Sequence, residues 1–464
     1  MIRQTLAAAA LLAASATIAT PVFAQSEQER LDARYDRALA AGYKALMLCS
    51  AIANAERNGA TRTPESVAEW EMAGIQAPLD GNAGDLPYSI QRFGSEPDWM
   101  AGKLQRVSVQ WADDMPARIA VHHYPRGCAL QPIGKGGVGV FFEEMAALEA
   151  PPLIHGFGDE PTRRSAVDGF SDRYGAGSRT TATLVIQNSR VVAEGYRAPF
   201  APDVPQRTWS VAKSVAATLI GAAQHRGEAE TGYPIDYPGW EGGDPRNPNI
   251  LLDNLLRMAS GRYSDTPGNR TDPLYWGGST VDETAALWPL IHPPATVFRY
   301  ANNDTLMAVK AIEDTFEDHP PAAFFAKLGM GHTVAETDWQ GNYILSSQVW
   351  STARDLAKFG QLYLNDGVLP DGTRVLPEGW VDYVSAASGP QPEGRPMGYG
   401  AGFWLFNQTD GIPPDTFAAM GNRGQYVVIV PSRDVVIVRR GEDPVGESFD
   451  ILAYTRDVLA ALGE

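Results

Sequence analysis

A serine and a lysine three residues apart carry the strongest chemical signal in this 464-residue chain. Ser210 and Lys213 open an apolar run that predicts a buried helix ending near Arg226. Positions i and i+3 share one face of a helix, so the amine is predicted to lie within hydrogen-bond reach of the hydroxyl. An amine that takes the hydroxyl proton makes a serine nucleophilic without any histidine. The spacing also occurs by chance, so further residues must define the site.

Tyr300 and Asn302 form a second polar segment, between an extended-looking run and a predicted helix. Alternate residues of extended backbone share a side, so the phenol and the amide are predicted to point into one space. A phenol, with an ordinary pKa of about 10, acts as a base only if cations such as Lys213 lower that pKa. The amide of Asn302 is predicted to hold Lys213 and a substrate carbonyl. Taken alone, the segment better fits a turn tyrosine followed by a helix-capping asparagine.

The third segment, Gly421-Asn422-Arg423-Gly424-Gln425, leads into a late hairpin. A small residue here would let a substrate lie against the strand edge as an added strand. The amide of Gln425 is then predicted to join that of Ser210 as an oxyanion hole, where each donor contributes on the order of 3 kcal/mol to the transition state. Taken alone, Gly424 fits a simple turn glycine.

The elements that must position these segments begin and end with strands. Turn signals between β-prone runs predict two hairpins, formed by residues 183–187 with 190–194 and by residues 425–430 with 435–439. Helical patterns lie between them, and a closing helix is predicted over residues 447–462. The predicted fold class is α/β (α+β), an antiparallel sheet flanked by helices with an all-helical insert.

The first third of the chain predicts a separate α+β extension. A long amphipathic helix over residues 27–57 precedes strands near 106–111 and 118–124. Prolines and a polar stretch mark a boundary near residue 160. The predicted organisation is an export signal over residues 1–24, an accessory domain over 25–160 and a second domain over 161–464.

The composition of the chain and its N-terminal residues indicate which binding partners are disfavoured and in which cellular compartment the protein is expected. The net charge is −17 without a long basic run, which argues against nucleic acid and anionic membranes. Arg3 precedes a short Ala/Leu-rich run, and small residues stand before Gln25, the pattern of a cleaved export signal. We expect a periplasmic or secreted protein without a stable membrane anchor, although an uncleaved anchor fits the same run. In an oxidising compartment Cys49 and Cys128 form one disulfide, with two buried thiols as the alternative.

Together, the three segments resemble the motifs of the penicillin-recognising serine hydrolases. The resemblance runs from about residue 164 to the end and is strongest for the class C β-lactamase-related branch, which holds esterases, D-aminopeptidases and 6-aminohexanoate-dimer hydrolases. Supporting runs are Thr208-Trp209-Ser210-Val211-Ala212-Lys213-Ser214, Leu255-Leu256-Arg257-Met258-Ala259-Ser260-Gly261, Ser351-Thr352-Ala353-Arg354-Asp355-Leu356-Ala357-Lys358-Phe359-Gly360 and Gly398-Tyr399-Gly400-Ala401-Gly402-Phe403-Trp404. The resemblance implies a β-lactamase/transpeptidase-like fold, a small amide or ester as the substrate and no cofactor.

The resemblance also implies roles for the matching positions. Ser210 would be the nucleophile, Lys213 with Tyr300 the base pair, and Asn302 the residue that orients lysine and substrate. Ser210 and Gln425 would supply the oxyanion amides, and water would clear the acyl-enzyme. Whether lysine or tyrosine takes the proton is left open.

One departure from the family pattern bears on the substrate. Asn422 stands where β-lactamases carry a lysine and many related hydrolases a histidine, followed by Arg423 and Gly424. A neutral amide cannot pair with a substrate carboxylate, and Arg423 should point to the other side of the strand. We therefore expect a hydrolase of amides or esters. A β-lactamase, a D-amino-acid peptidase and a non-turnover penicillin-binding receptor are the alternatives, and the oligomeric state is left open.

Two other catalytic designs are disfavoured. A Ser-His-Asp triad lacks the Gly-x-Ser-x-Gly motif, and His225 lies about four helical turns beyond Ser210. A metal site is not predicted, because His122 and His123 are adjacent on a strand, where their rings diverge, and no His-Glu-x-x-His occurs.

Overall fold

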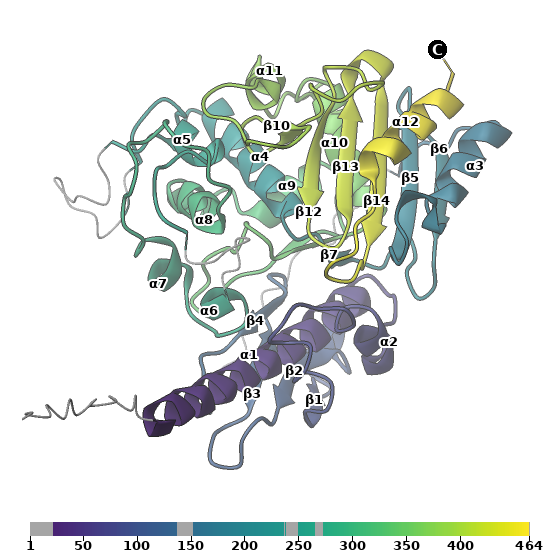
Figure 1. Ribbon diagram of the computed structural model, residues 1–464. Coiled ribbons are helices and arrows are strands. Elements are labelled where there is room, and N and C mark those ends of the chain that lie inside the picture. Colours follow the sequence, from purple (N-terminus) through teal and green to yellow (C-terminus); the bar gives the residue numbers. More distant parts are fainter. Residues whose placement is uncertain (1–21, 137–151, 236, 238–248, 265–271, 464) are drawn as a thin grey trace, which may run out of the picture.

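The computed structural model describes residues 22–136, 152–235, 237, 249–264 and 272–463. In this part of the chain, an N-terminal domain built around one long helix lies beneath a larger domain of sheet and helices (Figure 1). Most of the predicted export signal lies outside the described residues. The predicted cut before Gln25 falls in the first turn of the long helix.

The larger domain is built on a seven-stranded antiparallel sheet with the order β10-β11-β12-β13-β14-β5-β6. Its strands are β5 (Thr180–Gln187), β6 (Arg190–Tyr196), β10 (Gly398–Tyr399), β11 (Trp404–Leu405), β12 (Phe417–Gly421), β13 (Gln425–Val430) and β14 (Val435–Gly441). Both predicted hairpins are confirmed, since β5 pairs with β6 and β13 with β14. Asn188 and Ser189 have φ of 50° and 57°, the left-handed geometry of a two-residue hairpin turn. β14 also pairs with β5, so the two hairpins meet in one sheet.

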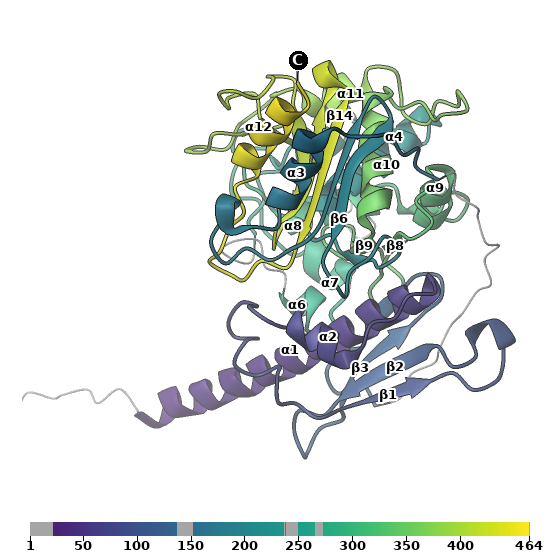
Figure 2. The ribbon, with the colours of Figure 1, turned by 90° about the vertical axis from the view of Figure 1, so that its right-hand side faces the viewer.

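Both faces of this sheet are covered by helices, because alternate strand residues point to opposite sides. One set of β13 and β14 side chains packs with α3 (Glu160–Asp168) and α12 (Ile451–Ala461) in a single apolar cluster; it comprises Val428, Val430, Val435 and Ile437. The alternating set packs with α4 (Val211–His225) and α10 (Ala353–Leu364); it comprises Val427, Ile429, Val436 and Val438. Figure 2 shows the sheet between these helix layers.

The predicted all-helical insert follows α4. It contains α5 (Leu252–Leu256), α6 (Asp272–Tyr275), α7 (Val281–Ala285), α8 (Asn302–Lys310) and α9 (Pro321–Lys327). α8 is buried along its length and packs against α4, α5 and α7. A small three-stranded sheet, β7 (Gln206–Arg207), β9 (Val349–Ser351) and β8 (Val334–Ala335), lies next to this region. α8 and β7 each place one end at the start of α4, where Ser210 stands.

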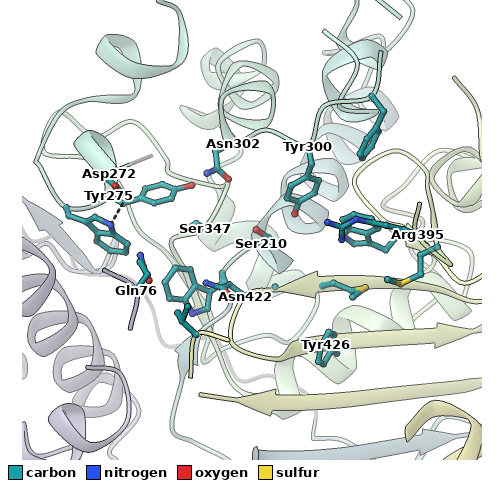
Figure 3. Close-up of a pocket in the computed structure, with 18 residues that line it drawn as sticks. Gln76, Ser210, Asp272, Tyr275, Tyr300, Asn302, Ser347, Arg395, Asn422 and Tyr426 are labelled. Atoms are coloured by element: carbon teal, nitrogen blue, oxygen red, sulfur yellow. Dashed lines mark hydrogen bonds between the residues drawn. The ribbon is translucent and has the colours of Figure 1, made fainter. Parts of the chain in front are cut away.

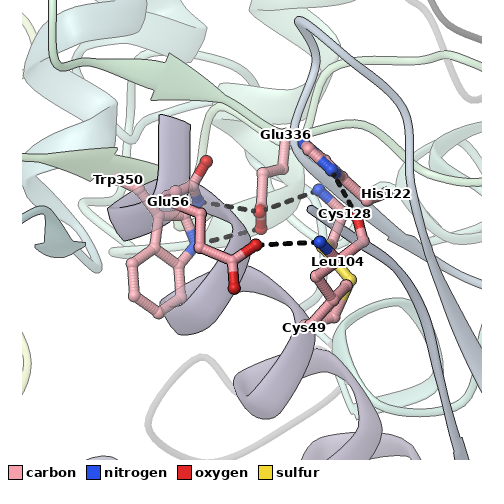
Figure 4. The surroundings of a disulfide bond; sticks show 8 residues. Cys49, Glu56, Leu104, His122, Cys128, Glu336 and Trp350 are labelled. Atoms are coloured by element: carbon pink, nitrogen blue, oxygen red, sulfur yellow. Dashed lines mark hydrogen bonds between the residues drawn. A yellow bond between two sulfur atoms is a disulfide. The ribbon is translucent and has the colours of Figure 1, made fainter. Parts of the chain in front are cut away.

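The N-terminal domain packs α1 (Val22–Arg57) across a four-stranded antiparallel sheet. The strands are β1 (Tyr88–Arg92), β2 (Leu104–Val109), β3 (Arg118–His122) and β4 (Cys128–Leu130), with the short α2 (Pro64–Glu69) between helix and sheet in sequence. The predicted disulfide is present: Cys49 on α1 and Cys128 on β4 are joined, with Cα atoms 6.1 Å apart (Figure 4). Buried residues of α1 belong to the same apolar cluster as those of α4, so the two domains share one core.

The helix from Ser26 to Arg57 is, among the described residues, the one segment long and apolar enough to cross a membrane. Its apolar window is fully buried inside the protein, however. Contacts with β2, β3 and β4 cover this stretch of α1. The composition of the helix is therefore explained by its place in the core.

Candidate active site

Ser210 stands at the N-terminus of α4, directly after Trp209, whose φ is 51°. Lys213 follows one turn later, and its Nζ lies 3.0 Å from Ser210 Oγ, as the spacing predicts. The same nitrogen donates to Asn302 Oδ1 at 2.6 Å and to the carbonyl of Ser346 at 2.9 Å. Because Lys213 is only 2% exposed, these contacts hold its amine against the serine.

The electrostatic surroundings of Lys213 favour its neutral form. Burial and the positive charge of Arg207 lower the pKa of Lys213 to about 7. The Arg207 guanidinium is itself buried and lies 3.8 Å from the centroid of the Trp209 ring. A lysine in water, with a pKa of about 10.4, would be almost fully protonated at neutral pH. In this site a large share of the amine is neutral near pH 7 and can accept the Ser210 proton.

Tyr300 reaches the same serine from the segment before α8. Its hydroxyl hydrogen-bonds with Ser210, and Lys213 Nζ lies 5.0 Å from the centre of its ring. Burial nevertheless raises the pKa of Tyr300 to about 12. The expectation of a lowered pKa is therefore wrong, because desolvation of the phenolate outweighs the hydrogen bonds with Ser210 and Trp404 and the charge of Arg395, which act to lower the pKa. Near neutral pH the phenol keeps its proton and can pass it on.

Asn302 begins α8 and is buried beside the lysine. Its side-chain oxygen accepts the shortest of the Lys213 contacts, so it orients the amine as the sequence predicts. The opposing carbonyl, that of Ser346, was not anticipated from the sequence. The Ser346 hydroxyl in turn shares a 2.6 Å hydrogen bond with Tyr275, which joins the lysine site to the helical region.

The glycine that lies against Ser210 is Gly421, the last residue of β12. A Cβ atom at Gly421 would come within 2.3 Å of the Thr208 carbonyl and 3.1 Å of the Ser210 amide nitrogen. Only a residue without a side chain allows this approach of strand to helix start. Asn422 follows and lines the same cavity as Ser210. The end of β12, which extends beyond its pairing with β11, therefore brings the backbone of residues 421 and 422 to the nucleophile.

Gly424 and Gln425, the predicted strand-edge residues, do not line this cavity. Gln425 is fully buried, and its side-chain oxygen accepts from Arg440 Nε at 2.6 Å while its amide donates to the Gly441 carbonyl. Gly424 has a φ of 78° and lies against Arg439. The prediction for these two residues is corrected, because the pairing of Gly421 with Gln425 places residues 422–424 in the turn.

These segments line one open cavity of about 530 Å³ (Figure 3). Its apolar walls are mainly aromatic and include Trp209, Trp276, Phe298, Trp404 and Tyr426. Gln76 lines the cavity as well, so the N-terminal domain contributes directly to the site. Nothing in its sequence context distinguishes Gln76, because its position depends on how two distant segments pack.

Two charged side chains line the cavity among the described residues. Asp272, at the start of α6, accepts a hydrogen bond from Trp276 Nε1 at 3.2 Å. Arg395 lies over the Trp404 ring, 5.5 Å from its centroid. Figure 3 shows Asp272 and Arg395 on opposite sides of Ser210. The cavity therefore has an anionic end and a cationic end with the serine between them.

The side chains of Asn422 and Arg423 point in different directions from the turn after β12. Asn422 lines the cavity, and its side-chain oxygen accepts from the Arg423 amide at 2.9 Å. Arg423 points away into the protein, as expected, but from the turn and not from a strand, and its guanidinium ends on carbonyls of the N-terminal domain. The cation next to the turn is thus unable to reach a bound substrate. Within the described ranges, no group of three His, Cys, Asp or Glu side chains is arranged to hold a metal ion.

Comparison with known protein families shows to which family the chain belongs. Residues 164–461 match the family model described as Beta-lactamase. The chain belongs to the beta-lactamase family. Members of this family are serine hydrolases, so this protein is a serine hydrolase of the beta-lactamase family, as its motifs predict. Its β-lactamase/transpeptidase-like fold, with an N-terminal extension, is also as predicted.

Relatives of this beta-lactamase family member include proteins named as 6-aminohexanoate-dimer hydrolases. The chain is 28% identical over 294 residues to a 6-aminohexanoate-dimer hydrolase of Paenarthrobacter ureafaciens, covering 57% of this chain and 73% of that protein. A Bacillus anthracis structure assigned as a 6-aminohexanoate-dimer hydrolase has a TM-score of 0.56 at 19% identity, over 68% of this chain and 88% of that one. A Bacteroides dorei structure assigned as a beta-lactamase has a TM-score of 0.52 at 20% identity, over 65% and 98%. These structures share the fold.

Proposed function

We propose that this protein hydrolyses small amide or ester bonds through an acyl-Ser210 intermediate. The observation that carries the proposal is the 3.0 Å contact between Ser210 Oγ and Lys213 Nζ, in a site that lowers the pKa of the lysine to about 7. A hydroxyl beside a largely neutral amine is an activated nucleophile. The cavity of about 530 Å³ is large enough for a small substrate.

In the proposed acylation, one proton passes from Ser210 to the leaving group by way of Lys213 and Tyr300. The bond from the carbonyl carbon to the leaving group is replaced by a bond to Ser210 Oγ. Ser210 Oγ attacks the substrate carbonyl carbon while its proton passes to Lys213 Nζ. The tetrahedral intermediate collapses as the carbon–nitrogen or carbon–oxygen bond breaks, and the leaving amine or alcohol receives a proton from Tyr300, which is replenished from Lys213. Water then attacks the carbonyl carbon of the ester on Ser210 and gives a proton to Lys213. The bond between that carbon and Ser210 Oγ breaks, Lys213 returns the proton to Oγ, and the acid is released.

Backbone amides are proposed to stabilise the developing oxyanion. Ser210 stands at the N-terminus of a 15-residue helix, where the helix dipole favours negative charge. The second donor is proposed to come from the backbone at Gly421 and Asn422, because this strand end lies against the Ser210 amide. This replaces Gln425, which pairs with Gly421 in β13 but does not itself line the cavity.

The two opposite charges in the cavity support a linear substrate with a positive charge at one end and a negative charge at the other. An amine on the acyl half would lie toward Asp272, and a carboxylate on the leaving half would lie toward Arg395. The 6-aminohexanoate dimer, the substrate named for the relatives, has this arrangement around its amide. Gly421, not Gly424, lies against Ser210. The position two residues before this glycine, where β-lactamases carry a lysine, is therefore Ala419. Alanine cannot pair with the carboxylate of a β-lactam, so we propose linear amides and esters above β-lactams.

A substrate panel tests the proposal directly. Purified protein is assayed with nitrophenyl esters, nitrocefin, D-amino-acid amides and the linear aminohexanoate dimer, with Ser210→Ala as the matched control. We expect repeated turnover of an ester or linear amide by the wild type and its loss in the variant. A stable adduct without product release would indicate a penicillin-binding receptor. Nitrocefin as the best substrate would indicate a β-lactamase.

Export to an oxidising compartment is proposed on two grounds. The first residues have the pattern of a cleaved signal, and Cys49 and Cys128 are joined as a disulfide. Mass spectrometry of protein from a fractionated host tests this. We expect a mature chain beginning at Gln25 outside the cytoplasm, whereas an intact N-terminus in the cytoplasmic fraction would contradict the proposal.

A further inference from the structure

Four buried charges join the N-terminal domain to the turn that follows β12. Arg62 and Glu71 from the N-terminal domain form an ion pair of 2.6 Å, and Arg423 and Glu442 from the larger domain form one of 2.8 Å. All four side chains are 2% exposed or less. The two pairs are close enough for Glu71 and Arg62 to act electrostatically on Glu442. Burying such charges is costly unless each is paired, so the cluster ties the two domains together.

Arg423 is the member that connects this cluster to the active site. Its Nη2 donates to the Trp70 carbonyl at 2.9 Å and to the Ala73 carbonyl at 2.7 Å, both in the N-terminal domain. It also donates to the Glu442 carbonyl at 3.2 Å. Its backbone has a φ of 56°, a left-handed conformation that is unfavourable for a residue with a side chain. Such a conformation persists only where the surroundings hold it.

The strained residue lies two positions after the glycine that touches Ser210. Gly421 approaches the Ser210 amide, Asn422 lines the cavity, and the Asn422 side chain accepts from the Arg423 amide. A change in the conformation at Arg423 would therefore move the backbone that faces the nucleophile. The same stretch of the N-terminal domain supports the cavity at a second point, where Val445 N donates to the Gly74 carbonyl at 2.8 Å.

We infer that Arg423 is a positioning residue for the oxyanion-binding turn, and that the N-terminal domain holds it in place through the Trp70 and Ala73 carbonyls. The inference rests on the proposed function. It gives the N-terminal domain, which lies outside the matched family region, a part in catalysis. The guanidinium acts through the backbone of residues 421 and 422 and does not touch the substrate.

Arg423→Gln and Arg423→Lys test the inference in the full-length protein, with the ester on which the wild type is most active. Removing one oxyanion donor costs roughly 100-fold or more in kcat, so we expect a loss of that order for Arg423→Gln with little change in KM. Arg423→Lys keeps the charge, but its single nitrogen cannot meet both the two carbonyls and Glu442, which Arg423 reaches through Nη2 and Nε, so it should rescue only part of the rate. Affinity for phenylboronic acid, which forms a tetrahedral adduct on serine, should fall in parallel with kcat.

The matched control is Asn58→Ala. Asn58 Nδ2 donates to the Asp203 carbonyl at 3.1 Å, so this variant also removes a side-chain–carbonyl contact between the domains but leaves the turn and the Arg423 cluster alone. We expect wild-type kcat and phenylboronic acid affinity for it. Equal losses in Asn58→Ala and Arg423→Gln would overturn the inference, because they would reflect general loosening of the interface.

Two further results keep this inference separate from the proposed function. If Arg423→Gln does not fold, Glu442→Gln removes the ion-pair partner and should give a smaller loss of kcat with the same fall in phenylboronic acid affinity. Unchanged kcat in whichever variant folds, while Ser210→Ala is inactive, would overturn the role of Arg423 alone. Activity that survives Ser210→Ala would instead overturn the proposed function.

Discussion

Lys213 Nζ lies 3.0 Å from Ser210 Oγ, in surroundings that shift the amine toward its neutral form. The protonated amine cannot accept the serine proton, and the pKa of Lys213 is lowered to about 7. With a neutral ester, kcat/KM should therefore rise with pH through about 7 and level off above it, measured between about pH 5 and pH 9. A flat profile, or one that rises near the ordinary pKa of lysine, would contradict this role. Lys213→Ala should lose roughly 100- to 10,000-fold in activity while remaining folded.

Tyr300→Phe tests whether Tyr300 is the proton donor to the leaving group and Lys213 is the base. Burial raises the pKa of Tyr300 to about 12, so the phenol holds its proton over the working range and can protonate a leaving group. Amides need this proton more than nitrophenyl esters do, because an amine is a poor leaving group. We expect a loss of about 10- to 100-fold for amides, a smaller loss for nitrophenyl esters, and an unchanged pH profile. Movement of the pH profile in Tyr300→Phe would instead assign the titrating group to the phenol.

Arg395→Gln and Asp272→Asn test the two ends of the cavity. If Arg395 meets a substrate carboxylate, its removal should raise KM by about 10-fold for a linear amide with a terminal carboxylate and leave the methyl ester of that substrate unaffected. Asp272→Asn should do the same for substrates with a terminal amine, compared with their acetylated forms. Equal effects on the charged and capped substrates would show that these residues only shape the cavity.

Glu336 supports the region around the disulfide. Its carboxylate accepts from Cys128 N at 3.0 Å, from Trp350 Nε1 at 3.0 Å and from Asn54 Nδ2 at 3.4 Å (Figure 4). Glu336→Gln places an amide donor against one of these donors, so it should lower the free energy of unfolding by about 1–3 kcal/mol. The change should appear in denaturant unfolding of the oxidised protein.

The difference in the free energy of unfolding between the wild type and Glu336→Gln should depend on pH. Burial raises the pKa of Glu336 to about 7 from an ordinary value near 4.5. The folded state therefore holds a proton that the unfolded state releases, and stability from this group falls as pH rises from about 4.5 to about 7. The advantage of the wild type over Glu336→Gln should be larger at pH 5 than at about pH 8. A difference that grows with pH would contradict the assignment.

Local patterns were sufficient to predict several parts of the fold. The turn residues Asn188 and Ser189 set one hairpin, because a two-residue left-handed turn is a property of neighbouring residues. The i, i+3 spacing placed Lys213 against Ser210 for the same reason. The disulfide was predicted from the presence of two cysteines and from an N-terminal pattern typical of export signals. These features depend on short stretches of sequence or on simple counts.

Features that depend on register and burial could not be predicted. Gly421 and Gly424 stand in the same segment, and only the pairing of Gly421 with Gln425 shows which of them faces Ser210. The opposite pKa shifts of Lys213 and Tyr300 arise from desolvation, which the sequence does not specify. Gln76 comes from a distant segment that reaches the cavity only after the domains pack together.

The most direct test of the mechanism is the mass of the protein during turnover. A nitrophenyl ester is mixed with the enzyme, quenched with acid early in the reaction, and the digested protein is mapped by mass spectrometry. We predict an added acyl group on the peptide that carries Ser210, absent in Ser210→Ala and lost as product accumulates. Product formed without an adduct on Ser210, or at wild-type rate by Ser210→Ala, would contradict the account.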